Sequence, residues 1–236
     1  MSELIFVRHG QASFGADSYD KLSTAGVEQI KLLSSHWHTL GETFDHIYAG
    51  SLQRQQETAS ELLPHVSETS REPKLHTGFN EYNGDPLITI YLRDHSTDGG
   101  FPQGLNQPIR DERLFQKVFE AATAKWIRNE LEAKEQDKNF ELWKDFQNRV
   151  HNAIDELMVR HQNGSRVLIS TSGGVIALAL QRALGFPDQQ VITTNWMVHN
   201  SSVTKIRYGN GKVSLTMFNN IAHLEKPELR HMVTFR

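Results

Sequence analysis

The sequence contains no cysteine, no long apolar run and no excess of basic charge. The absence of cysteine excludes disulfide frameworks, thiolate nucleophiles and cysteine-ligated zinc or iron-sulfur sites. No apolar run approaches the ~20 residues that a transmembrane helix needs, so we expect no membrane partner. The chain carries 25 Lys and Arg against 28 Asp and Glu, without the basic excess of a duplex-binding protein, so we expect no nucleic-acid partner.

The overall composition is that of an ordinary globular protein. Hydrophobic residues make up 38% and charged residues 22% of the 236 positions, and a chain of this length can bury a large core without metal or disulfide support. The first ten residues become charged too early for a signal peptide. We therefore expect one cytoplasmic domain spanning residues 1–236.

Strand, loop and helix patterns alternate in the first part of the chain. The apolar residues 4–7 predict a buried strand that runs into the polar pair Arg8 and His9. Ser23 stands before an amphipathic helical pattern, and residues 45–49 predict a second strand. Ser51 is expected to cap a helix that ends near Pro64.

Residues 85–107 lack a regular pattern, because glycine and proline interrupt them repeatedly, and residues 113–131 then predict a helix. We interpret residues 85–139 as an insertion that forms a lid. Arg93, Arg110 and Arg113 lie in it, where they could meet an acidic substrate or simply pair with neighbouring acids.

Later segments predict a helix at 140–160, a strand at 166–170, a helix at 175–184 and a hairpin with strands 202–208 and 212–218 around Asn210-Gly211. Strands that alternate with helices indicate a parallel sheet covered on both faces. The expected fold is α/β, a three-layer α/β/α sandwich with a mostly parallel central sheet and a helical insertion.

Polar residues follow three predicted strands, where open α/β sheets bind their ligands. They are Arg8 and His9 after the first strand, Arg54 in the helix after the second, and Ser172 and Gly173 after the strand at 166–170. Backbone N–H groups at a glycine-rich helix start can hold a phosphate, and arginines add positive charge. A neutral imidazole facing a solvent-filled pocket could attack phosphorus, although Arg-His after a strand can also be an ordinary polar loop.

Three segments resemble the signature of the histidine phosphatase superfamily, also called phosphoglycerate mutase-like. They are FVRHGQ at 6–11, LSTAGVEQ at 22–29 and AGSLQRQQETA at 49–59. This resemblance implies that His9 becomes phosphorylated, that Arg8 and Arg54 clamp the phosphate, and that Glu81 protonates the leaving oxygen. Gln11 and Ser13 are the polar groups available for substrate where the family often has an asparagine, a stretch that also contains Gly15 and Ala16.

The sequence departs from the family at Ser172, where a second histidine usually completes the phosphate pocket. A serine hydroxyl cannot carry positive charge, and losing one such donor can cost ~100-fold to 1000-fold in rate. Ser172 and Gly173 remain candidate substrate-binding residues. His199 or His223 could replace the missing imidazole, and either could instead be a structural histidine.

These observations favour a phosphatase-like hydrolase that acts on small phosphate monoesters through a phosphohistidine on His9. The alternative is a phosphate-binding or regulatory protein with little turnover, because Ser172 replaces a charged group; a phosphoglycerate mutase is a less favoured third reading. The chemistry requires neither metal nor cofactor, and the expected partner is a small phosphorylated substrate. The sequence specifies neither the substrate's identity nor the oligomeric state.

Overall fold

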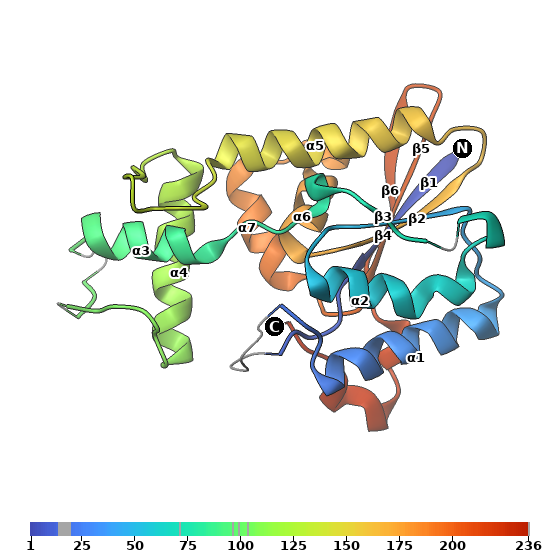
Figure 1. Ribbon diagram of the computed structural model, residues 1–236, viewed down its shortest axis with the longest axis horizontal. Helices are drawn as coiled ribbons and strands as arrows, with labels where there is room; N and C mark the ends of the chain where they lie inside the picture. The colour runs from blue at the N-terminus through green and yellow to red at the C-terminus, as the bar shows by residue number, and fades with distance from the viewer. Residues whose placement is uncertain (14–19, 71, 96, 99, 103, 236) are drawn as a thin grey trace. The chain divides into compact units, whose positions relative to one another are not determined.

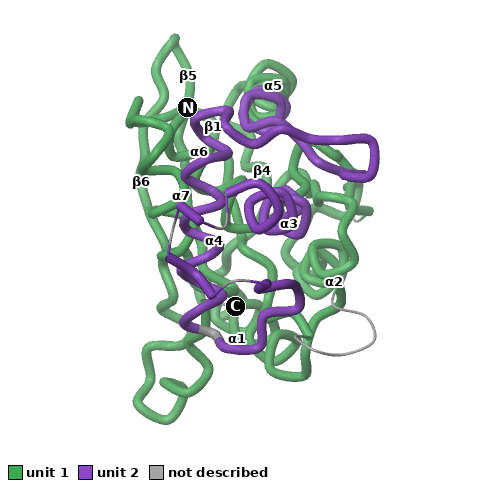
Figure 2. Tube along the Cα trace, turned by 90° about the vertical axis from the view of Figure 1, so that its left-hand side faces the viewer, with its two compact units in different colours: residues 1–81, 150–236 green, residues 82–149 purple. Residues whose placement is uncertain are grey.

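The computed structural model describes residues 1–13, 20–70, 72–95, 97–98, 100–102 and 104–235 (Figure 1). The chain divides into two compact units, one formed by Met1–Glu81 with Val150–Arg236 and the other by Tyr82–Arg149 (Figure 2). The insertion expected at 85–139 lies within the second unit. Every candidate site residue lies within the first.

A six-stranded sheet runs through the first unit. Its strands are β1 (Ser2–Arg8), β2 (His46–Ala49), β3 (Lys74–Leu75), β4 (Arg166–Thr171), β5 (Val203–Gly209) and β6 (Lys212–Asn220). They follow the order β3-β2-β4-β1-β5-β6. The β3–β2, β2–β4 and β4–β1 pairs are parallel. β5 pairs with β1 and with β6, and both pairs are antiparallel. The sheet is therefore mostly parallel, as expected.

Strand β1 occupies an interior position because its side chains are apolar on both faces. Leu4, Ile5, Phe6 and Val7 are all completely buried. A continuous apolar run is typical of a strand that helices cover on both sides. The hairpin at the other end of the chain turns at Asn210 and Gly211, as predicted, with left-handed backbone angles (φ 53° and 71°).

Helices cover both faces of this sheet (Figure 1). α1 (Thr24–Leu40) and α2 (Gln53–Leu62) pack on one face, where Ile30, Leu33 and Leu62 join a core with sheet residues such as Ile5. α6 (Gly173–Leu184) and the part of α5 (Trp143–Arg160) within this unit lie on the other face. The expected three-layer α/β/α arrangement is confirmed.

The second unit contains α3 (Gly84–Asp94) and α4 (Glu112–Ile127). The expectation of an irregular segment from residue 85 onward is wrong for α3. The Asn83 side chain caps this helix by accepting the Asp85 N–H, and Pro86 is compatible with a first helical turn because no intrahelical partner is lost there. The buried face of α3 is formed by Leu87, Ile88, Ile90, Tyr91 and Leu92.

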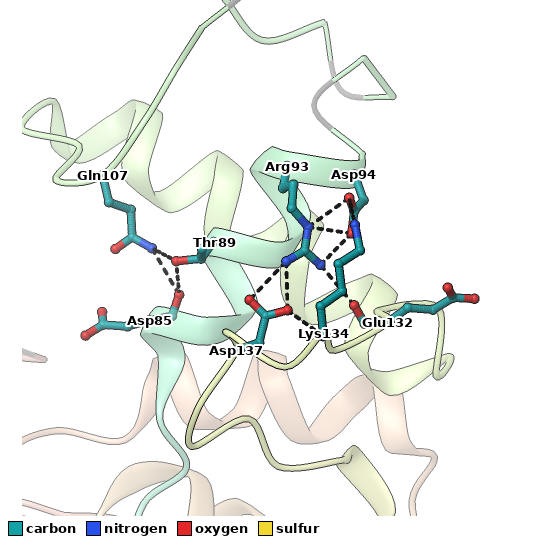
Figure 3. Close-up of polar contacts among 8 residues, drawn as sticks. All are labelled: Asp85, Thr89, Arg93, Asp94, Gln107, Glu132, Lys134 and Asp137. Carbon is teal, nitrogen blue, oxygen red and sulfur yellow. Dashed lines mark hydrogen bonds and ion pairs between the residues drawn. The ribbon is translucent and has the colours of Figure 1, made fainter.

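Arg93 pairs with acids of the second unit (Figure 3). Its guanidinium donates to Asp137 over 2.7 Å and to Asp94 over 2.6 Å, and also to the Glu132 carbonyl over 3.0 Å. The Asp137 side chain is only 3% exposed, whereas those of Arg93 and Asp94 are 24% and 27% exposed, so the network lies at the surface of the unit and is partly buried. Of the two roles considered for Arg93, contact with an acidic substrate or pairing with neighbouring acids, the structure shows the pairing.

The remaining helices are α7 (Asp188–Met197), which the sequence analysis did not predict, and the short 3-10 turns Leu63–His65, Glu68–Ser70, Thr77–Phe79, Ala222–Leu224 and Pro227–Met232. Among the described residues, no helix has both the length and the apolar character needed to cross a bilayer. Within the same residues, no three His, Asp or Glu side chains converge as a metal site would require.

Candidate active site

The ends of β1, β2 and β4 lie along one edge of the sheet. β1 and β4 are neighbours with Arg8 paired to Thr171, so His9 and Ser172 follow directly beyond the last pair. The His9 N–H donates to the Thr171 carbonyl over 2.8 Å. Because β2 flanks β4 on its other side, the loop that leads to Arg54 begins at the same edge. The topology brings together the three loops that the sequence singled out.

The loop after β1 packs directly against the backbone of α1. A Cβ atom at Gly10 would lie 2.3 Å from the Gly26 carbonyl oxygen, and one at Gly26 would lie 2.1 Å from the Gln11 carbonyl oxygen. Neither contact is sterically possible, since both would meet backbone atoms. The two glycines therefore permit the close approach that holds the His9 loop against α1.

His9 is a desolvated and neutral imidazole. Its ring is covered, with the residue only 6% exposed, so the expectation of a solvent-facing side chain is wrong. Burial, followed by the positive charges of Arg54 and Arg8, holds the pKa of His9 well below its ordinary value of 6.5. The hydrogen bond to the Gly10 carbonyl acts in the opposite direction and is the weaker influence.

The hydrogen bonds of the His9 ring define its tautomer. Nδ1 lies 2.7 Å from the Gly10 carbonyl oxygen, which can only accept, so Nδ1 carries the proton. Nε2 lies 3.2 Å from Nε of Arg54, which can only donate, so Nε2 presents its lone pair to the guanidinium. This is the protonation state that a nucleophilic imidazole needs.

Arg54 is held in place by Asp20, which the sequence analysis did not identify. Nη1 of Arg54 lies 2.5 Å from the Asp20 carboxylate. The other carboxylate oxygen accepts the Gln53 N–H over 2.8 Å, and the Asp20 carbonyl accepts the Arg54 N–H over 2.7 Å. Asp20 thus aligns the guanidinium with His9 and supplies negative charge at the start of α2.

The prediction that Ser51 caps α2 is wrong. The cap position is Leu52, whose side chain makes no capping bond, and the Asp20 carboxylate supplies an acceptor there instead. The Ser51 hydroxyl accepts a hydrogen bond from the Asn80 side chain over 2.8 Å. A long-range contact has therefore replaced the local cap that a serine at this position ordinarily provides.

Arg8 lies at the end of β1 and turns toward the segment that precedes β5. Its Nη1 donates to the carbonyl oxygen of Val198. Its charge contributes to the lowered pKa of His9. Arg8 and Arg54 thus both place positive charge near the imidazole, as a phosphate-binding pocket requires.

The Gln55 side chain contacts Ser172. Its Nε2 donates to the Ser172 hydroxyl over 2.8 Å and to the Phe79 carbonyl over 3.0 Å. Both Gln55 and Ser172 are buried, the serine being 1% exposed. The neutral amide of Gln55, the residue after Arg54, therefore contacts Ser172, the position where the family usually has a second histidine.

Glu81 follows the 3-10 turn Thr77–Phe79, and its side chain reaches the start of α6. Its Oε2 accepts the Gly174 N–H over 2.9 Å, so the carboxyl group faces the segment formed by Ser172 and Gly173. The positive end of a helix favours negative charge at this place. The candidate acid is thus next to the candidate phosphate-binding serine, although the two are about ninety residues apart in the sequence.

His199 and His223 bind other partners. The His199 ring contacts the Asn219 side chain over 2.9 Å and packs on Phe235 with ring centroids 4.3 Å apart. His223 contacts the Ser201 hydroxyl over 2.8 Å, and burial lowers its pKa to about 4. Neither histidine contacts Ser172, so the structure gives no support to their replacing the missing imidazole.

Gln11 and Ser13 make contacts that hold the His9 loop together. The Gln11 side-chain oxygen accepts the Ser23 hydroxyl over 3.0 Å, and the Ser13 hydroxyl donates to the Leu22 carbonyl over 3.0 Å. Their role in substrate binding stays a prediction. Gly15 and Ala16 lie outside the described residues.

Replacing Ser172 with histidine tests whether this pocket has kept room for an imidazole. Because Ser172 is buried and its hydroxyl contacts Gln55, we expect Ser172→His to lower the free energy of unfolding by about 1–3 kcal/mol without raising turnover. Urea denaturation and phosphatase assays on the purified variant measure both effects. Ser172→Ala, which removes only the hydroxyl, is the control, and higher turnover of Ser172→His in mild acid would contradict the expectation.

Stability is expected to fall as the pH falls from 6.5 toward 4. The pKa of His223 is lowered to about 4 by burial first and by the nearby His36 second. Between these pH values the unfolded chain therefore binds a proton at His223 more readily than the folded chain does. Complete protonation of His223 in the folded state lowers the free energy of unfolding by roughly 3 kcal/mol. Urea denaturation at several pH values measures the slope. Burial lowers the pKa of His161 to about 4 as well, so His223→Gln should make the slope shallower without abolishing it. His38→Gln, which changes an exposed histidine, should leave the slope unchanged, and an unchanged slope in His223→Gln would contradict this account.

Comparison with known proteins places the chain in a family. The profile of the histidine phosphatase superfamily (branch 1) matches residues 4–89 and 111–221. No curated protein sequence matches significantly. Among solved structures, a Bacillus anthracis phosphoglycerate mutase matches with TM-score 0.63 and 20% identity, covering 94% of each chain.

Two phosphatases have the same fold. An Entamoeba histolytica phosphoserine phosphatase, solved with phosphoserine, matches with TM-score 0.61 and 18% identity over 95% of this chain and 100% of its own. A mycobacterial glucosyl-3-phosphoglycerate phosphatase, solved with inorganic phosphate, matches with TM-score 0.60, the same identity and the same coverages. The profile match extends over most of the sequence and includes His9, Arg54 and Ser172, so the chain belongs to the histidine phosphatase superfamily.

Proposed function

We propose that this protein hydrolyses small phosphate monoesters through a phosphohistidine intermediate on His9. The observation that carries the proposal is the neutral His9 ring, whose Nδ1 is bound to the Gly10 carbonyl while Nε2 presents its lone pair to Arg54. A nucleophile must be unprotonated, and the lowered pKa of His9 maintains that state at neutral pH. Membership of a superfamily that contains phosphatases and mutases supports the same chemistry.

In the proposed first step, the substrate phosphate displaces the guanidinium of Arg54 from Nε2, and its nonbridging oxygens bind Arg8 and Arg54. Nε2 of His9 then forms a bond to phosphorus while the bond from phosphorus to the ester oxygen breaks. Protonated Glu81 gives its proton to the departing oxygen. The two arginines stabilise charge on the phosphoryl oxygens in the transition state.

In the second step, a water molecule attacks phosphorus and the bond to His9 breaks. Ionised Glu81 accepts the water's proton and is ready for the next cycle. Ser172 and the N–H group of Gly173 contribute neutral hydrogen bonds to the phosphoryl group. We favour hydrolysis over mutase activity because a mutase must exclude water and return the phosphoryl group to a second acceptor.

The test is hydrolysis of p-nitrophenyl phosphate in the presence of a chelator, from about pH 4 to pH 8. We expect turnover that persists in the chelator, since side chains supply every role. A rapid quench with labelled substrate, followed by peptide mapping, should find phosphate on His9. Phosphate bound tightly without turnover would instead favour the phosphate-binding or regulatory alternative, and label on any other residue would refute the mechanism.

A further inference from the structure

Three polar side chains connect the end of the chain to the loop that carries His9. They are Gln29 on α1, Asn200 in the segment before β5, and Thr234 in the C-terminal tail. Gln29 and Asn200 are completely buried. Buried amides of this kind are retained only when their hydrogen bonds are made, so their partners are informative.

The hydroxyl of Thr234 joins the two amides. It accepts from Nε2 of Gln29 over 2.9 Å and donates to Oδ1 of Asn200 over 2.9 Å. Backbone contacts fix the tail in the same place, since Gln29 also donates to the Met232 carbonyl over 2.7 Å and the Asn200 N–H donates to the Thr234 carbonyl over 2.9 Å. A single hydroxyl thus acts as acceptor and donor between α1 and the segment before β5.

The other ends of the two amides hold the backbone next to the imidazole. Oε1 of Gln29 accepts the Gln11 N–H over 2.8 Å, and Nδ2 of Asn200 donates to the His9 carbonyl over 3.2 Å. These are the two peptide groups on either side of Gly10. We call Thr234 and the two amides that it joins, Gln29 and Asn200, the bridge. The bridge therefore holds the loop at the two peptide groups that follow His9.

The Gln11 N–H and the Gly10 carbonyl belong to one planar peptide group. Holding that N–H fixes the direction of the Gly10 carbonyl, which accepts the proton on Nδ1 of His9. The same hydrogen bond determines the tautomer and points Nε2 toward Arg54. A path of hydrogen bonds therefore runs from Thr234 through Gln29 and one peptide plane to the His9 ring.

We propose that Thr234 is a positioning residue, whose hydroxyl orients His9 through Gln29 and Asn200. This inference rests on the proposed function and deepens it, by assigning the C-terminal tail a part in aligning the nucleophile. Small displacements of a reacting group can lower a rate substantially, even when the altered residue does not touch the substrate. The expected effect is on turnover, because the two amides hold the peptide groups on either side of Gly10, next to the nucleophile.

Thr234→Val removes the hydroxyl and keeps the shape, whereas Thr234→Ser keeps the hydroxyl. With p-nitrophenyl phosphate, we expect Thr234→Val to lower kcat by about 10-fold or more with little change in KM, and Thr234→Ser to stay near the wild type. Exchange of the Gln11 amide hydrogen, followed by NMR on the intact protein, should be faster in Thr234→Val only. If the valine variant does not fold, as its melting temperature would show, Thr234→Ala is measured in its place.

Wild-type kcat and wild-type amide exchange in Thr234→Val would overturn the inference. Equal losses in the valine and serine variants would also overturn it, since they would show that tail packing and not the hydroxyl matters. If the wild-type protein itself hydrolyses nothing, the proposed function fails, and amide exchange alone then decides whether the bridge holds the loop. Faster exchange in Thr234→Val with a normal rate in Thr234→Ser supports the bridge in that case as well.

Discussion

His9→Ala is expected to abolish formation of the phosphoenzyme and to lower kcat/KM for p-nitrophenyl phosphate by about 10⁴-fold or more. Alanine removes the only side chain that forms a bond to phosphorus in the proposed mechanism. Arg54 keeps its contacts with Asp20, so the phosphate-binding side of the pocket should survive. Steady-state kinetics and acid-quench labelling measure the two losses, and isothermal titration with inorganic phosphate measures what binding remains.

The fold is expected to tolerate this change with a loss of about 1 kcal/mol, because His9 is buried and its removal leaves a small void. Far-UV circular dichroism and urea denaturation provide this control. His38→Ala, at an exposed position on α1, should change neither activity nor stability. Retained phosphoenzyme formation in His9→Ala would show that another residue is the nucleophile.

Glu81→Gln is expected to slow alkyl phosphates by about 10² to 10³-fold and aryl phosphates far less. An alkoxide is a poor leaving group and needs a proton as it departs, whereas a nitrophenolate does not. Glutamine keeps an oxygen that can accept the Gly174 N–H, so the start of α6 should be preserved. The ratio of kcat/KM values for an alkyl and an aryl ester, measured in wild type and variant, isolates the proton transfer.

Glu57→Gln is the matched control for this experiment. The Glu57 carboxylate also accepts a backbone N–H, that of Leu22 over 2.8 Å, but the proposed mechanism gives it no proton to transfer. We expect it to change the rates of both ester classes by the same small factor. Equal losses on alkyl and aryl esters in Glu81→Gln would remove Glu81 from the role of general acid and leave it the structural role of accepting the Gly174 N–H at the start of α6.

Five of the six strands, all but the two-residue β3, and the site loops could be predicted because their signals are local. Leu4 to Val7 form an uninterrupted apolar run, and Asn210-Gly211 is compatible with few structures other than a hairpin turn. Once the sheet is parallel, the residues after its strands must share an edge. That reasoning places His9 and Ser172 at the same edge, and the pairing of β1 with β4 in the structure makes them neighbours.

Two helices escaped prediction for different reasons. α3 begins at Gly84 with Pro86 in its first turn, and both residues ordinarily indicate a break, although the first turn is where a helix accepts proline. α7 buries few of its residues, chiefly Val191 and Ile192, so its sequence carries little of the periodicity that reveals an amphipathic helix.

By itself the sequence determined the layered α/β fold, the family, and the residue types that line the site, because propensity, periodicity and short motifs act over a few neighbouring positions. Only the tertiary structure decided the partners of those residues: Asp20 for Arg54, Gln55 for Ser172 and the acids of the second unit for Arg93. It also decided the buried state of His9 and the bridge through Thr234. The physical reason is that hydrogen bonds and desolvation depend on atoms brought together from distant parts of the chain, and no local pattern records which side chains will meet there.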